Sequence, residues 1–174
     1  MMRFATIAIS VCLGAAGFAE TQTVFLEDGA GARIEIATLE QTEGGPYKIT
    51  MNSGSFTDHF LSMRPFKCLE GPGKHWCHVP YPYEIARDVS GDLTDLEYDF
   101  LFVWKGANEY GINMWNGVYY VLQREEGRLI GQMHEMDMDI LSVPPDPGEL
   151  RPVSAKHLHE SDPDSHWLPR LVIE

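Results

Sequence analysis

The stretch NGVYYVLQREEGRLIGQMHEMD, residues 116–137, decides the fold of this chain. Two runs, 116–123 and 128–137, lack the 3.6-residue period of a helix and stand on either side of Arg124-Glu125-Glu126-Gly127. Glycine accepts the positive φ that tight hairpin turns need, and such a turn between two strand-like runs is typical of a β-hairpin. Residues 116–137 are therefore predicted to form a hairpin.

The same pattern extends outward over residues 20–143. Short strand-like runs alternate with turn residues such as those at 28–31, 44–46 and 52–54. The segment 97–105 (EYDFLFVWK) is apolar on both faces over 100–104, as in a central strand. About seven short strands at regular spacing predict an all-β domain, folded as a small antiparallel barrel or sandwich. At most one short helix is expected, at 81–89 or after the capping residues 90–92.

Residues 144–174 have a different composition, because prolines recur through PPDPGELRPVSAKHLHESDPDSHWLPRLVIE. Proline excludes long helices and central strands. This segment is predicted to be an extended tail that packs on the domain 20–143, docked by Trp167 and by the apolar run 171–173.

Residues 1–19 have the pattern of a cleaved signal peptide. Arg3 precedes an apolar run over 4–16, and Gly17-Phe18-Ala19 places small residues one and three positions before the expected cut. No later run is long and apolar enough to span a bilayer, which needs about 20 residues. The protein is therefore expected to be secreted or periplasmic.

The charge of the chain narrows the choice of partners. It has 26 acidic and 13 basic residues, which gives a formal net charge of −13 with neutral histidines. Such a surface repels nucleic acid phosphates. Nucleic acid is therefore excluded as a partner, whereas a small molecule or an envelope protein is compatible with this charge.

Two cysteines lie in KCLEGPGKHWCH, residues 67–78. Haem attachment and catalytic redox motifs place two residues between their cysteines, whereas eight separate Cys68 from Cys77. In an oxidising compartment, this pair predicts a structural disulfide across the Gly71-Pro72-Gly73 turn. No haem is expected.

Two segments offer possible metal ligands. In MHEMDMD, residues 133–139, a strand would place His134, Met136 and Met138 on one face, a ligand set suited to Cu(I). In the tail, His157 and His159 have the alternate spacing of a weak chelate. The competing interpretation is that the methionines fill the core and the tail histidines are solvated. No cofactor is expected unless one of these sites binds a metal.

Aromatic residues are concentrated in and around the predicted strands. Two interpretations are open: these residues fill the core, or a subset of them lines a pocket at the open end of a barrel. The candidates for a ligand pocket are Trp76, Tyr81, Tyr98, Phe102, Trp104, Trp115 and Tyr119.

No motif with a defined catalytic mechanism occurs in the chain. Asp95, Glu97 and Asp99 would form a row of carboxylates on one face of a strand, which is also typical of an exposed strand in an acidic protein. The sequence therefore predicts a non-catalytic β-barrel-like protein that binds a small ligand or an envelope partner. A periplasmic copper- or zinc-binding protein is the alternative, and a hydrolase acting on an envelope substrate comes third.

Overall fold

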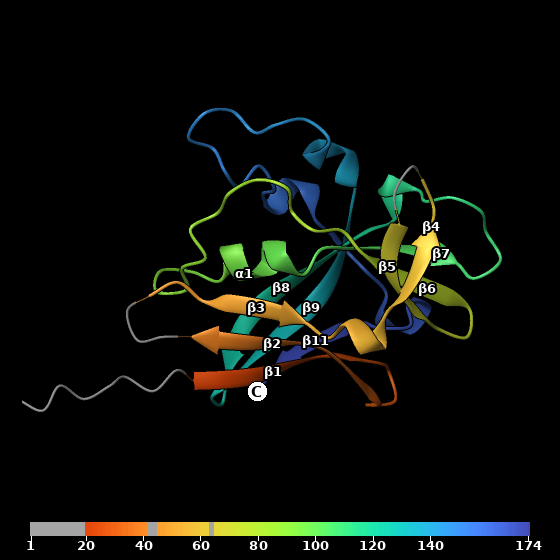
Figure 1. Ribbon diagram of the computed structural model, residues 1–174, viewed down its shortest axis with the longest axis horizontal. Coiled ribbons are helices and arrows are strands. Elements are labelled where there is room, and N and C mark those ends of the chain that lie inside the picture. The colour runs from red at the N-terminus through yellow and green to blue at the C-terminus, as the bar shows by residue number, and fades with distance from the viewer. Residues whose placement is uncertain (1–19, 42–44, 63–64) are drawn as a thin grey trace, which may run out of the picture.

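The computed structural model describes residues 20–41, 45–62 and 65–174, which form one large antiparallel sheet with a single short α-helix (Figure 1). The all-β prediction is confirmed. The described residues contain eleven strands rather than about seven, and the sheet does not close into a barrel. The predicted signal peptide, 1–19, lies outside the described residues. None of the described helices is long and apolar enough to cross a bilayer.

The strands are β1 (Glu20–Glu27), β2 (Arg33–Gln41), β3 (Lys48–Met51), β4 (Thr57–Phe60), β5 (Pro65–Glu70), β6 (Lys74–His78), β7 (Phe102–Gly106), β8 (Gly117–Glu125), β9 (Arg128–Met136), β10 (His159–Glu160) and β11 (Arg170–Ile173). The α-helix is α1 (Thr94–Asp99), and short 3-10 turns are η1 (Ser53–Ser55), η2 (Met114–Asn116), η3 (Met138–Leu141), η4 (Ala155–His157) and η5 (Pro163–Ser165). The strand order is β3-β2-β1-β11-β9-β8-β7-β6-β5-β4, and β10 pairs with β9.

The β8–β9 hairpin is the longest paired element and confirms the prediction for residues 116–137. Its nine cross-strand pairs run from Gly117 opposite Met136 to Glu125 opposite Arg128. The two turn residues, Glu126 and Gly127, have φ values of 48° and 82°. Positive φ at both positions matches the right-handed twist of the strands, which is why glycine at position 127 favours this turn.

The sheet is weakly joined between its two halves. β7 pairs with β8 at only two positions, Phe102 opposite Val118 and Val103 opposite Gly117. In Figure 1, β1–β3 lie on the left and β4–β6 on the right, and in the strand order the hairpin comes between these two groups. Beyond Val118, the edge of β8 that faces β7 has no partner among the described strands.

Two apolar clusters lie on opposite faces of the hairpin. Val118, Tyr120 and Leu122 join the main core, which includes residues from both halves of the sheet. Tyr119 and Met136 join a second cluster, which α1 and the segments following β6 and β9 cover. Residues with successive numbers along β8 thus enter different cores, as strand alternation requires.

The end of the chain departs from the expectation for a proline-rich tail. Residues 170–173 form β11, a central strand between β1 and β9, whose Leu171, Val172 and Ile173 are fully buried. The reason is local: Pro169 directly precedes β11, so every residue of this strand keeps its backbone N–H. The expected docking of run 171–173 therefore takes the form of strand pairing.

The segment before β7 meets one expectation and departs from another: the short helix follows the capping residues 90–92, one of its two predicted positions, but it occupies the start of the predicted strand 97–105. Residues 94–99 are helical rather than the beginning of a strand, and the strand starts only at Phe102. The side chain of Asp92 accepts a hydrogen bond from the Thr94 N–H (2.9 Å), which satisfies a free donor at the start of this helix. As predicted for a central strand, Phe102 and Val103 are both fully buried, although they face opposite sides of the sheet.

The disulfide between Cys68 and Cys77 is confirmed and joins two residues that lie directly opposite each other in β5 and β6. Replacing both cysteines by alanine is expected to lower the free energy of unfolding by about 2.7 kcal/mol, because the unfolded chain gains the conformational entropy of the opened loop. Urea denaturation of the oxidised and the double-alanine protein measures this difference. The oxidised protein after treatment with a reductant serves as the control and should lose the same amount.

Candidate functional site

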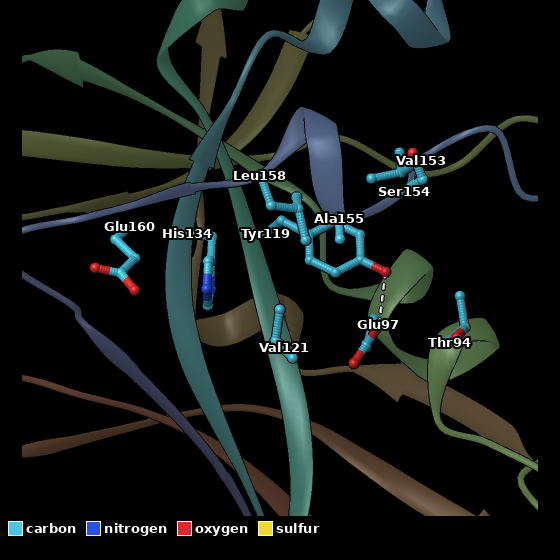
Figure 2. A pocket seen from close by; sticks show the side chains of 10 residues that line it. All are labelled: Thr94, Glu97, Tyr119, Val121, His134, Val153, Ser154, Ala155, Leu158 and Glu160. Atoms are coloured by element: carbon cyan, nitrogen blue, oxygen red, sulfur yellow. Dashed lines mark hydrogen bonds between the residues drawn. The ribbon is translucent and has the colours of Figure 1, made fainter.

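A pocket of about 530 Å³ lies beside the β8–β9 hairpin, between α1 and the C-terminal segment 153–160. Its lining residues, shown in Figure 2, are Thr94, Glu97, Tyr119, Val121, His134, Val153, Ser154, Ala155, Leu158 and Glu160. Another hollow of similar volume is lined only by residues of the single loop 148–157. The first pocket joins three separate parts of the chain and combines apolar with polar walls, as ligand sites do.

Glu97 holds α1 against the free edge of β8. Its Oε1 accepts a hydrogen bond from the Leu122 N–H (2.7 Å), and its Oε2 accepts one from the Tyr119 hydroxyl (2.6 Å; Figure 2). Since β7 does not reach Leu122, the helix satisfies a buried strand donor that would otherwise lack a partner. The same contact places a carboxylate at the pocket.

The environment of Glu97 is unfavourable for its charge. Only 8% of the residue is exposed, and burial raises the pKa of its carboxyl group above the ordinary value. The hydrogen bonds from Tyr119 and Leu122 lower this pKa but only partly offset the effect of burial. Carboxyl groups with a raised pKa inside a pocket are concentrated at functional sites, and ion-pair networks also produce them.

The C-terminal wall of the pocket is fixed to α1 and to the second apolar cluster. Arg151 contacts the almost fully buried Asp95 through Nη2 and Nε, both at 2.7 Å from Oδ1. Two residues further on, the Val153 N–H donates to the Tyr98 hydroxyl (2.7 Å). The Tyr81 hydroxyl donates to the Leu150 carbonyl (2.6 Å) on the other side of Arg151. Three polar contacts in four residues therefore hold this wall in place.

His134 and Glu160 form the opposite rim. They lie directly across from each other in the β9–β10 pair, so their side chains share one face of the sheet. Nδ1 of His134 lies 3.1 Å from the Gln132 carbonyl, which only accepts hydrogen bonds, so Nδ1 carries a proton. In the neutral ring, Nε2 is then an acceptor.

Three of the seven aromatic pocket candidates gather at this site. The rings of Tyr81 and Tyr98 are 4.6 Å apart, and those of Tyr98 and Tyr119 are 6.1 Å apart, each pair edge to face. Tyr119 lines the pocket, while Tyr81 and Tyr98 lie behind it and bind the C-terminal wall through their hydroxyl groups.

The other four candidates lie elsewhere. Trp76 and Phe102 are fully buried in the main core. Trp104 packs edge-on against His166, with ring centroids 5.7 Å apart, and the Lys74 ammonium lies 4.0 Å from its ring centroid. Trp115 stands 71% exposed in η2. The structure therefore does not gather the seven into one pocket.

The candidate metal ligands are also separated. Met136 and Met138 are buried in the second apolar cluster, whereas His134 lies at the pocket rim. Nδ1 of His157 accepts the Ser154 N–H (3.1 Å), and His159 is exposed on β10. Within residues 20–41, 45–62 and 65–174, no group of three or more His, Cys, Asp or Glu side chains is arranged to hold an ion. Metal binding at these residues stays a prediction.

Several residues of the pocket were not singled out as a site by the sequence. The sequence predicts Glu97 only as part of a carboxylate row with Asp95 and Asp99, and on the helix these three side chains diverge. Asp95 contacts Arg151, Glu97 contacts Tyr119, and Asp99 accepts a hydrogen bond from the Tyr47 hydroxyl (2.8 Å). The available signal was the group of capping residues at 90–92, which favours a helix from about residue 93 onward.

Comparison with known proteins gives no family assignment. No protein-family model matches this chain, and no curated protein or solved structure shows significant similarity to it.

Proposed function

We propose that this is a secreted or periplasmic, non-catalytic binding protein that takes a small ligand in the pocket between α1, the β8–β9 hairpin and the C-terminal segment. The observation that carries this proposal is the pocket itself, with its volume of about 530 Å³ and its combination of apolar walls with a few fixed polar groups. Sites for small molecules are of this size and character.

The contacts of Glu97 favour binding over catalysis. Both of its oxygens already accept hydrogen bonds from groups of the protein, Tyr119 and Leu122. A general acid or base must exchange its proton with the substrate within hydrogen-bond reach, whereas these contacts hold the carboxylate in one place against the hairpin. A group fixed in this way suits recognition of a ligand.

The disulfide supports the proposed compartment. Disulfides form and persist in oxidising environments such as the periplasm and the extracellular space. Cys68 and Cys77 are both fully buried and paired in register, as expected of a structural bridge. The pattern of residues 1–19 supports the same compartment.

Filling the pocket tests the proposal. We expect Ala155→Trp to abolish the binding of fragments that shift the backbone amide resonances of residues 119–121 and 153–155, since a large ring would occupy the cavity. A fragment library screened by NMR against the ¹⁵N-labelled mature protein supplies these ligands, and the loss of affinity should exceed about tenfold, or 1.4 kcal/mol.

Ala30→Trp is the matched control, because Ala30 is an exposed alanine in the β1–β2 turn and does not line the pocket. This variant should bind the same fragments with unchanged affinity. If no fragment shifts the resonances of the pocket, or if Ala155→Trp leaves binding intact, the pocket is not the ligand site.

A further inference from the structure

The charges around the pocket are unbalanced. Two carboxylates line it, Glu97 and Glu160, and no lysine or arginine appears among the lining residues that the structure describes. Arg151, a basic residue that contacts α1, is already paired with both Asp92 and Asp95. His134 is therefore the one lining residue that can carry a positive charge, and Glu160 lies directly opposite it.

Glu97 retains capacity for a further partner. A carboxylate has about four lone-pair sites, and the contacts with Tyr119 and Leu122 use one on each oxygen. Both of these donors are neutral, and no lysine or arginine of the described residues pairs with the carboxylate of Glu97. A cationic ligand would supply the positive charge that this carboxylate lacks. The site is largely desolvated, and charge-assisted hydrogen bonds are strong there.

The rest of the lining is suited to a short hydrocarbon body. Val121, Val153, Ala155 and Leu158 present methyl groups from both the hairpin and the C-terminal segment. Figure 2 shows Val121 between His134 and Glu97 on the hairpin side, with the side chains of the C-terminal segment facing it. An apolar group seated there would leave its polar end near Glu97, while Glu160 lies beyond His134 on the other side of the pocket (Figure 2).

We propose that the ligand of this pocket is a small organic cation, an ammonium group on a short apolar body, which Glu97 and Glu160 recognise by charge and Val121, Val153 and Leu158 by apolar contact. This inference rests on the proposed function, since it names the chemical class of ligand for the same pocket. The ammonium binds the free lone pairs of Glu97, and Glu160 contributes from the rim.

Three probes with the same phenethyl body and different charge test this inference in the full mature chain. They are phenethylammonium, 2-phenylethanol and 3-phenylpropanoate, titrated at neutral pH with NMR shifts at the pocket as the readout. We expect the ammonium to bind at least about tenfold more tightly than the alcohol, a difference of 1.4 kcal/mol. The carboxylate should bind more weakly than the alcohol.

Variants separate charge recognition from simple burial. Glu160→Gln should weaken the ammonium by about threefold, or 0.7 kcal/mol, and leave the alcohol unchanged. Glu125→Gln, an exposed carboxylate at the far end of β8, is the control and should change neither. Glu97→Gln should weaken the ammonium more than Glu160→Gln does, and a melting curve establishes that this variant is folded.

The pH dependence provides a second readout. The ammonium remains protonated throughout the acidic range, so its affinity follows the charge of the pocket, to which Glu97, Glu160 and His134 contribute. Because burial raises the pKa of Glu97, affinity should begin to fall at a higher pH than for an ordinary exposed glutamate. In Glu97→Gln, this part of the pH dependence should disappear.

The outcomes distinguish the inference from the proposed function. If the alcohol or the carboxylate binds as tightly as the ammonium, and Glu160→Gln affects none of them, the pocket binds ligands but does not select cations. If fragments occupy the pocket while the ammonium does not, the inference is likewise overturned and the proposed function stands. If neither fragments nor probes bind, both fail.

Discussion

Replacing Asp95 by alanine is expected to lower the free energy of unfolding by about 1.5–3 kcal/mol, because it removes a buried carboxylate that accepts charge-assisted hydrogen bonds from the more exposed Arg151. Asp95 is 1% exposed, and its Oδ1 binds Arg151 through two nitrogens at 2.7 Å. Its other oxygen accepts the Asp88 N–H (3.3 Å). The substitution leaves this donor and one side of the guanidinium without their partner. Chemical denaturation followed by circular dichroism measures the loss.

Asp92→Ala is the matched control, since Asp92 binds the same guanidinium but its side chain is 58% exposed. Exposed ion pairs contribute less than about 1 kcal/mol, so this variant should be much closer to the original protein. Asp95→Ala should also weaken ligand binding, because Arg151 fixes the segment that forms one wall of the pocket. Equal effects of the two substitutions on stability would contradict the role assigned to the buried contact.

The hairpin at 117–136 was predictable because its information is local. The turn residues, the strand-like runs and their spacing all lie within 22 residues, and the structure confirms them. The helix at Thr94–Asp99 was harder to predict, since six residues are too few to distinguish a helical period from strand alternation. Short helices also owe most of their stability to tertiary packing.

The pocket depends on contacts between residues that are distant in the sequence. The hydrogen bonds between Glu97 and Leu122, between Tyr98 and Val153, and between Asp95 and Arg151 span 25, 55 and 56 residues. β7 pairs with β8 only up to Val118, and the rest of this edge of β8 is therefore free for Glu97. No local sequence pattern predicts where this pairing ends. The sequence therefore predicted the strands, whereas the position of the pocket depends on the fold.

The aromatic residues also separate what the sequence predicts from what only the fold determines. Their concentration was visible in the sequence, but the choice between core and pocket depends on which face of a strand each one occupies. Neighbours on β8 illustrate this, since Tyr119 lines the pocket while Tyr120 is fully buried in the main core. A shift of one residue in register would exchange their places.

Trp76→Ala is the second substitution with a large expected effect, a loss of about 3–5 kcal/mol in the free energy of unfolding. Trp76 is fully buried, and its Nε1 donates to the Tyr120 hydroxyl (3.1 Å), which in turn donates to the Leu168 carbonyl (2.7 Å). The substitution opens a cavity and removes one member of this chain of hydrogen bonds. Thermal and chemical denaturation provide the measurement.

Trp115→Ala serves as the comparison, because this tryptophan is 71% exposed and its removal should change stability by no more than about 0.5 kcal/mol. Trp76→Phe retains most of the buried volume and gives a folded protein for ligand titration. Trp76 belongs to the main core and Tyr119 to the second cluster, so Trp76→Phe should leave phenethylammonium affinity unchanged while Tyr119→Phe reduces it. If Trp76→Phe weakened binding more than Tyr119→Phe did, the ligand would lie among the aromatic residues of the main core, and the site would have to be moved to the other face of β8.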